Sequence, residues 1–441
     1  MKKGQILATT LISSVALLSL ASCGGNSGKK VINFYCSAGN QIVGPIEEKV
    51  KAFNESNKDG YQIKIVNPGD YDQLKDKIKA DLKVKSQPAI AYCYPDHVAE
   101  YLAGSYKDKV IDLQERFIKD DKEFANIKFI DKYYEEGKIF AEGKLYTLPF
   151  VKSTEVMYVN TNLLTAAGIQ LSELDTWESI FKDGGVADKL KAKYDKKTPI
   201  GIDSSDNLFI TLCEQYGLPY TQQSDTIEDR YLFNNAKNEK MLKSLNKKVQ
   251  DGKLTTRGVM GGAYTSTKFV TQDLVMSIGS TGGANHQDPE GAFNYAVLPY
   301  PKKENSERVS ISQGPSLIMF EQNTDEAEND AWKFIKTLFS DELQTTFSTV
   351  SGYMPVTATS YENESYKNFL DKDSIVSKTI KLASSVKDSF FVSPAFDGSN
   401  TARQEVGKAL DTVLAASKND NVDQITKDAL LNAFKMCTFY K

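Results

Sequence analysis

The chain has 441 residues, of which 40% are hydrophobic and 25% are charged, so it is long and apolar enough for two domains of ordinary size. Its formal charge of −4 argues against nucleic-acid binding, because phosphates require clustered Lys and Arg side chains. Only two histidines occur, His97 and His286, which argues against a His-rich zinc site, and we expect neither a metal nor a cofactor.

Residues 1–22 have the pattern of an export signal. Two lysines precede the apolar stretch Ile6–Leu20, which is too short for a comfortable membrane span. It ends in Leu20-Ala21-Ser22-Cys23, which resembles the bacterial lipobox and implies lipid attachment at Cys23. The alternative is an ordinary secretory signal with an incidental cysteine. Residues 23–30 are rich in Gly, Ser and Asn and predict a flexible tether between the lipid and the folded body.

The next part of the chain predicts alternating strands and helices. Strands are expected at Val31–Tyr35, Tyr61–Val66 and Pro88–Tyr94, with helices at Pro45–Asn54 and Tyr71–Lys83. This alternation indicates a parallel sheet with right-handed crossovers, whose ligands bind beyond the carboxyl ends of the strands. The end loops there carry Tyr71, Tyr94, Asp96 and His97, and we expect His97 to be a loop or helix-start residue and not a ligand.

The stretch Gly143–Leu164, GKLYTLPFVKSTEVMYVNTNLL, places a polar bend between two apolar strands. The bend contains Ser153 and Thr154, which could simply satisfy the backbone of an ordinary β-turn. However, the stretch resembles the first lobe-to-lobe crossover of the extracellular solute-binding proteins of ABC importers, in the branch that binds maltose, oligosaccharides and glycerol-3-phosphate. The resemblance continues from about Val31 to about Leu414.

This resemblance implies an α/β, two-lobed, type II periplasmic-binding-protein fold. Each lobe is then a mixed β-sheet flanked by helices, with a hinge between the lobes and a ligand cleft that Ser153 and Thr154 face. VMSIGSTGG resembles the second crossover, with Ser280 at the cleft. The alternative, a phosphate-cradling turn, lacks the usual Lys-Ser/Thr. We therefore assign 31–148 plus 275–322 to lobe 1 and 149–274 plus 323–441 to lobe 2.

Other segments extend the resemblance to individual ligand-binding residues. NPGDYDQL implies such a role for Tyr71, and YPDHVAEYL implies one for Tyr94 and Asp96, although glycerol-phosphate binders have a Glu directly after the Tyr. SQGPS implies that the backbone at Gly314 approaches the ligand, and SGYMPV places Tyr353 in the cleft. Relatives also carry a ligand-contacting arginine at the position of Arg403, whose alternative role is a solvated helix start.

Asp203 and Asp206 mark a departure from the glycerol-phosphate binders. They fall where those proteins carry two cleft-lining tryptophans, so carboxylates replace aromatic rings. The alternative is that both acids only cap the following helix, whose dipole favours negative charge. The two tryptophans of this chain, Trp177 and Trp332, occur in helices and look structural.

Together these features predict a substrate-binding lipoprotein that captures a hydroxyl-rich solute and delivers it to an ABC permease. A carbohydrate is favoured by the carboxylates, whereas glycerol-3-phosphate or a glycerophosphodiester is the alternative. An exported glycosidase using two of the acids is the rival class. We expect no catalytic residues, no nucleic-acid partner, a monomer, and a location on the extracellular face of the cytoplasmic membrane. Cys36 and Cys93 permit a disulfide, but free buried thiols are expected.

Overall fold

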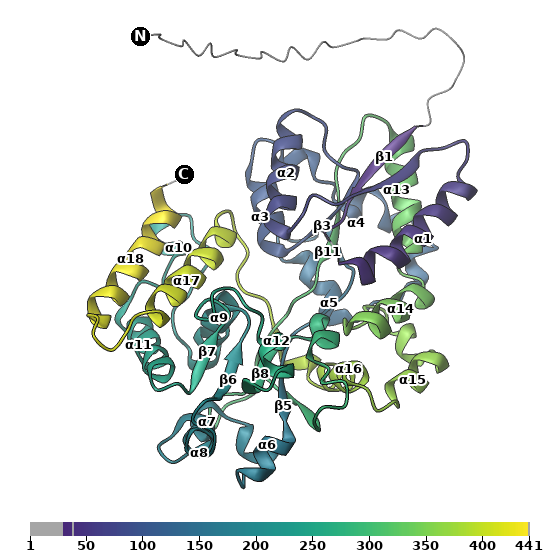
Figure 1. The fold of residues 1–441 in the computed structure, drawn as a ribbon. Coiled ribbons are helices and arrows are strands. Elements are labelled where there is room, and N and C mark those ends of the chain that lie inside the picture. The colour runs from purple at the N-terminus through teal and green to yellow at the C-terminus, as the bar shows by residue number, and fades with distance from the viewer. Residues whose placement is uncertain (1–29, 38, 440–441) are drawn as a thin grey trace, which may run out of the picture.

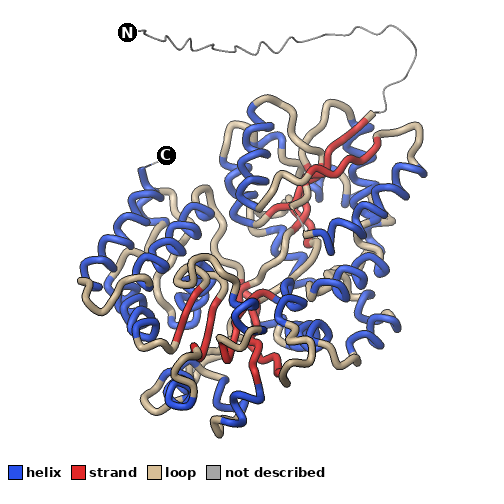
Figure 2. Tube along the Cα trace, viewed as in Figure 1, coloured by secondary structure: helices blue, strands red, loops and turns tan. Residues whose placement is uncertain are grey.

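The computed structural model describes residues 30–37 and 39–439, so the predicted export signal, Cys23 and most of the tether lie outside the described residues. Two five-stranded mixed sheets, each flanked by helices, form two lobes (Figure 1). Figure 2 shows the strands of these sheets as two separate groups surrounded by helices. The predicted α/β architecture of two mixed sheets is confirmed.

The first sheet has the order β2-β1-β3-β11-β4. Its strands are β1 (Val31–Tyr35), β2 (Gln62–Val66), β3 (Ile90–Cys93), β4 (Thr147–Pro149) and β11 (Ser316–Met319). β1 runs parallel to β2 and β3, whereas β11 is antiparallel to β3 and β4. Its helices are α1 (Asn40–Ser56), α2 (Tyr71–Lys83), α3 (Pro95–Ala103), α4 (Leu113–Arg116), α5 (Asp131–Glu135), α13 (Asp325–Thr337) and α14 (Asp341–Ser351).

The second sheet has the order β7-β6-β8-β5-β9. Its strands are β5 (Glu155–Asn160), β6 (Thr198–Ile202), β7 (Leu254–Thr256), β8 (Leu274–Ser280) and β9 (Tyr295–Pro299). The helices after β5 are α6 (Thr161–Ala166), α7 (Trp177–Phe181), α8 (Val186–Lys193), α9 (Ser205–Tyr216), α10 (Ile227–Arg230), α11 (Ala236–Gln250) and α12 (Thr265–Val270). Near the C-terminus, α15 (Glu364–Leu370), α16 (Ile375–Ser385), α17 (Ser399–Leu414) and α18 (Val422–Phe439) follow.

The side chains of β5 show how the second sheet is buried on both faces. Met157 and Val159 belong to a core shared with helices α9, α11 and α17, whereas Val156 and Tyr158 point to the opposite face. This follows from the alternation of side chains along a strand. The second face belongs to one continuous apolar cluster that also includes the core of the first sheet. An apolar core therefore extends from one lobe into the other.

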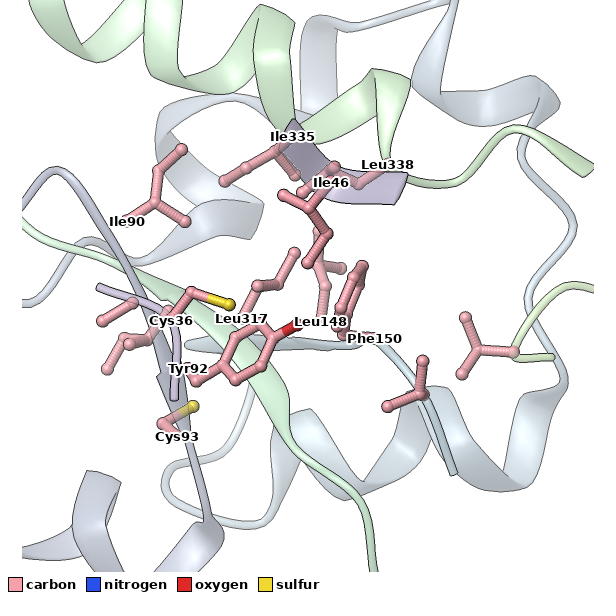
Figure 3. Packing of buried hydrophobic residues seen from close by; sticks show 14 of the residues in the cluster. Cys36, Ile46, Ile90, Tyr92, Cys93, Leu148, Phe150, Leu317, Ile335 and Leu338 are labelled. Atoms are coloured by element: carbon pink, nitrogen blue, oxygen red, sulfur yellow. The ribbon is translucent and has the colours of Figure 1, made fainter. Parts of the chain in front are cut away.

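The core of the first lobe packs around Tyr92 and Phe150, whose ring centroids lie 5.3 Å apart (Figure 3). Leu317 of β11, Leu148 of β4 and Ile46 of α1 lie in the same cluster, so segments far apart in the sequence share one core. Cys36 and Cys93 are buried there as free thiols, as expected from the sequence. Burial raises the pKa of the Cys36 thiol to about 12.

Within the described residues, three segments connect the two lobes. The first, 150–154, joins β4 to β5; the second, 300–315, joins β9 to β11; the third contains β12 (Phe390–Phe391) and leads to α17. The second and third pair through β10 (Ser310–Ile311), which runs parallel to β12. The first and second pair through reciprocal backbone hydrogen bonds of 2.9 Å between Ser153 and Gln313. We call these three segments the hinge.

The second crossover and the lobe boundaries predicted from sequence are wrong. β8 pairs with β5 and β6 in the second sheet, and after Ser280 the chain returns to that sheet as β9 through a short 3-10 helix, η6 (Thr281–Gln287). The crossover therefore lies at 300–315, and most of 275–322 belongs to lobe 2. Residues 323–441 are divided too, because α13 and α14 contact α1 whereas α17 contacts α9 and α11.

Candidate ligand cleft

A cavity of about 620 Å³ lies between the lobes and the hinge. Apart from Thr154 and Asp203, all the predicted ligand residues line it: Tyr71, Tyr94, Asp96, Ser153, Asp206, Ser280, Gly314, Tyr353 and Arg403. They come from the start of α2, the end of β3 and start of α3, the hinge, the start of α9, the end of β8, the segment after α14, and α17. Residues more than 300 positions apart in the chain thus share one cavity, which has the dimensions of a small-molecule site.

Three tyrosines form one wall of this cleft. The rings of Tyr71 and Tyr94 meet edge to face with centroids 4.8 Å apart. Tyr353 packs against Gly282, where an added Cβ would lie 2.6 Å from the ring, so a larger residue at 282 would displace it. Burial raises the pKa of all three phenols, so they are neutral at physiological pH and both donate and accept hydrogen bonds. Such a wall suits a solute that has apolar ring faces and hydroxyl edges.

Arg403 also lines the cleft and is held by two residues of α9. Its Nε donates to Asp206 Oδ2 at 2.7 Å, and its Nη2 donates to Asn207 Oδ1. Burial opposes the charged form, but Asp206 and Asp96 outweigh burial and raise the pKa of the guanidinium. Arg403 lies in the first turns of α17, one turn after its start at Ser399, and is only partly exposed. The alternative of a solvated helix-start arginine does not describe this position.

A second ion pair joins the hinge residue Lys152 to Glu136. Lys152 is 2% exposed, and its Nζ lies 2.5 Å from Glu136 Oε2, while Ser312 donates to Glu136 Oε1 at 2.7 Å. All three residues line the cleft. Sequence reasoning missed Lys152 and Glu136, although Lys152 directly precedes the predicted Ser153-Thr154 pair. Lys152 and Arg403 therefore each already have a carboxylate partner, as charges withdrawn from water require.

Thr154 and Asp203 lie outside the cavity. Thr154 is fully buried, and its hydroxyl donates to the Ile311 carbonyl at 2.8 Å, so it fastens the hinge. Asp203 accepts a hydrogen bond from the backbone of Thr265 at 2.8 Å and lines a neighbouring groove that also contains Asp206. Neither acid is the N-cap of α9, because that role belongs to Ser204. The capping alternative is therefore wrong for Asp203, whereas Asp206 does lie in the first turn of α9, where the helix dipole favours negative charge, and also lines the cleft.

Contacts between α17 and the first lobe close one side of the cleft. Gln404 donates to Asp72 Oδ1 at 2.6 Å. The side-chain amide of Asn400, oriented to satisfy its neighbours, donates to Asp96 at 3.1 Å and accepts from Lys75 at 2.6 Å. Sequence reasoning missed Asn400 and Gln404, because nothing in a helix sequence indicates which loop of another lobe it meets.

His97, as predicted, lies in the first turn of α3; it is buried, and burial lowers its pKa.

A smaller cavity of about 330 Å³ adjoins the cleft. It shares Tyr71 and Tyr353 with the cleft and is otherwise lined by residues such as Tyr92, Val151 and His286.

Within the described part of the chain, His, Cys, Asp and Glu side chains form no group suited to hold a metal ion. Among residues 30–37 and 39–439, no helix has the length and apolar character needed to cross a bilayer.

Residues 48–371 match the family model of bacterial extracellular solute-binding proteins. The chain belongs to this family. It is 27% identical over 378 residues, 82% of each chain, to the sn-glycerol-3-phosphate-binding periplasmic protein UgpB of Escherichia coli K12. Its fold is similar to that of UgpB from Mycobacterium tuberculosis in complex with glycerophosphocholine, with a TM-score of 0.73, 16% identity, and coverage of 93% of this chain and 98% of that one.

A second solved structure has a similar fold. The ABC substrate-binding protein Lmo0181 from Listeria monocytogenes, in complex with cycloalternan, aligns with a TM-score of 0.72 at 18% identity, covering 92% of this chain and 99% of the other. These likenesses confirm the type II binding-protein fold expected from the sequence. The family is one of binding proteins that act outside the cytoplasm.

Proposed function

We propose that the chain captures a neutral, hydroxyl-rich solute, a carbohydrate, and delivers it to the permease of an ABC importer. The carrying observation is the chemistry of the cleft: three neutral tyrosines line it, and two of its three cations, Lys152 and Arg403, are already paired with carboxylates. Such pairs offer hydrogen-bond donors and acceptors to hydroxyl groups without presenting excess positive charge. The tyrosine rings supply stacking surfaces for an apolar sugar face.

The charge of the lining favours a neutral solute over a phosphorylated one. The acids Asp70, Asp72, Asp96, Glu136 and Asp206 line the cleft, against the cations Lys152, Arg257 and Arg403. A phosphate would meet these acids as like charges and would compete with Asp206 and Glu136 for their partners. Both effects reduce the affinity for an anion.

Glycerol-3-phosphate or a glycerophosphodiester is the second candidate. The likeness to UgpB and the position of Arg403, whose guanidinium can form bidentate bonds to a phosphate, favour it. The rival idea, a glycosidase, has less support. Of the predicted acids, Asp206 is held by Arg403, Asp203 lies outside the cavity, and the family relatives are binding proteins.

Lobe closure is the proposed mode of capture, since folds of this kind close around ligands by hinge motion. The hinge residues Ser153 and Gly314 line the cleft, so a solute would contact the segments that must bend. The bonds from Gln404 and Asn400 to the first lobe would form as the lobes close. We propose that the cleft-lining residues named above contact the captured solute.

We further propose that the mature protein is a monomer anchored by lipid at Cys23 on the extracellular face of the cytoplasmic membrane. The Leu-Ala-Ser-Cys end of the export signal supports this anchor. Cys23→Ala should move the protein from the membrane fraction to the soluble fraction, or block its processing. Unchanged fractionation of this variant would refute the anchor.

The solute class is tested by a thermal-shift screen of neutral sugars, polyols and their phosphates. A ligand at 100 times its dissociation constant stabilises the folded state by roughly 2.7 kcal/mol, which such a screen resolves. We expect neutral saccharides to raise the melting temperature and glycerol-3-phosphate to have little effect. Stabilisation only by phosphorylated compounds would establish the second candidate. Release of product from glycosides during incubation would instead indicate an enzyme.

A further inference from the structure

Glu155 is a buried carboxyl group close behind the ligand cleft. It is the first residue of β5, lies opposite the cleft residue Ser280 in the β5–β8 ladder, and is 2% exposed. Its Oε1 accepts a hydrogen bond from Asn207 Nδ2 at 3.2 Å, whereas its Oε2 has no partner in the part of the chain that the structure describes. Because an unsatisfied buried polar atom costs free energy, this arrangement calls for a reason.

Asn207 connects Glu155 to the cleft. Its amide nitrogen donates to Glu155, and its amide oxygen accepts from Nη2 of Arg403. Asn207 is itself 3% exposed, so these partners determine which way the amide faces. The Glu155 acceptor thereby orients the Asn207 oxygen toward Arg403, and Asp206 holds the same guanidinium through Nε at 2.7 Å.

We propose that Glu155 is a positioning residue for solute binding, which through Asn207 holds the guanidinium of Arg403 in its orientation at the cleft. This inference rests on the proposed function only in assuming that Arg403 contacts the solute. It assigns a role to a residue that does not itself line the cavity.

Glu155 performs this role as a neutral acid. The charged and titratable groups around it are Arg403 from α17, Asp203 and Asp206 beside β6 and at the start of α9, and Tyr300 after β9. The one cation in this set, Arg403, is already paired with Asp206. Burial, which outweighs the hydrogen bond from Asn207, and the neighbouring acids raise the pKa of Glu155 to about 8.

Ionisation of Glu155 would place a second anion behind Arg403. It would draw the guanidinium toward Asn207 and away from the solute, so the affinity should fall as the pH rises through the pKa of Glu155. A merely structural glutamate would not couple to Arg403 in this way.

The coupling is measurable on the protein alone. Arginine-selective ¹⁵N labelling permits an NMR pH titration of the Arg403 Nε resonance between about pH 6 and pH 9.5, with Arg403→Lys identifying the signal. We expect the resonance to shift with a midpoint near the pKa of Glu155. The shift should vanish in Glu155→Gln, which keeps an acceptor for Asn207 but cannot ionise. Asn207→Ala should abolish it as well, and it serves as the second variant if Glu155→Gln does not fold.

Glu328→Gln is the matched control, since it changes a buried glutamate of the first lobe that is held by Arg116 and not by Arg403. The Arg403 titration should persist in this variant. A constant Arg403 resonance in the wild type, or an unchanged titration in Glu155→Gln, would overturn the proposal.

Calorimetry with maltose and with glycerol-3-phosphate as probes adds the binding readout. Whichever probe binds should lose at least about fivefold in affinity from pH 7 to pH 9. This is the lower end of the range by which one site typically changes the affinity of another. Glu155→Gln should remove this loss, and a loss that persists in the variant would contradict the positioning role. If neither probe binds, the pH dependence is measured with the solute found in the thermal-shift screen, while the NMR titration decides the role of Glu155 without any solute.

Discussion

At the scale of single residues, the sequence predicted most of the cleft because its motifs carry short polar runs at strand ends. Tyr71, Ser153 and Tyr353 are examples, and all three line the cavity. Partners contributed by another segment were not predictable, because no local pattern connects Glu136 to Lys152 or Asn207 to Arg403. Asp203 was expected at the cleft together with Asp206, but its bond to the Thr265 backbone holds it outside.

Tyr353→Ala should weaken solute binding by about 1–3 kcal/mol, since it removes a stacking ring from the cleft wall. The melting temperature without solute should change less, because the ring packs at the cavity and is only partly buried. Calorimetric titration with the solute found by screening, together with thermal unfolding, provides the measurement. Tyr194→Ala, a half-buried tyrosine outside the cleft, is the control. If Tyr353→Ala does not fold without solute, Tyr353 is a core residue and its assignment to the cleft fails.

Asp206→Asn should weaken the binding of a neutral sugar by roughly 1.5–3 kcal/mol, because it removes a charged acceptor and a partner of Arg403. Asp203→Asn should have a clearly smaller effect, since Asp203 does not line the cleft. Titration of both variants with the same saccharide makes the comparison. Equal losses would show that the solute reaches the neighbouring groove, and tighter binding of a phosphorylated solute would reverse the assignment of solute class.

Glu155→Gln should alter the pH dependence of stability. The folded-state pKa of about 8 lies above the ordinary 4.5, so the folded protein retains a proton that the unfolded chain releases in this window. The free energy of unfolding of the wild type therefore falls as the pH rises from about 4.5 to 8. The glutamine variant should lack this fall, on the order of a few kcal/mol. The measurement is urea unfolding of both proteins at about pH 5 and pH 9. An equal change in the free energy of unfolding between the two pH values in both proteins would contradict the prediction.

At the scale of elements, periodicity located strands and helices well, and β1 and α2 have the predicted bounds. α1 begins at Asn40, five residues before the predicted start, and contains Pro45. The topology was less predictable. A strand followed by Ser280-Thr281-Gly282-Gly283 looks the same whether the chain changes lobe or turns back, and only the pairing of β9 with β5 decides between them.

The hinge depends on a glycine at 314. Its φ is +98°, and an added Cβ would lie 2.2 Å from the Val151 carbonyl oxygen of the neighbouring hinge segment. Gly314→Ala should therefore cost at least about 1–3 kcal/mol of stability, from backbone strain and from separation of the two segments. Gly283→Ala, where the space is open and φ is −110°, is the control and should be nearly neutral. Equal denaturant midpoints for the two variants would show that the hinge accommodates a Cβ at position 314 and would contradict the prediction.

At the scale of the whole molecule, two sheets share a continuous apolar core on one side and a polar cleft on the other. The shared core holds the lobes together near α14 and α16, whereas α17 meets the first lobe through polar pairs such as Gln404 with Asp72. Polar contacts exposed to water exchange readily with solvent, so that side is suited to open. The architecture therefore places the bending segments at the floor of the cleft.

The central claim, a cleft for a neutral hydroxyl-rich solute, is tested most directly by calorimetric titration of a neutral saccharide and of glycerol-3-phosphate at low and high salt, about 0.02 and 0.5 M. We predict that the saccharide binds one molecule per chain with an affinity that salt hardly changes, because attraction between net charges is not involved. Binding of glycerol-3-phosphate alone, with an affinity that falls steeply as salt is added, would contradict it.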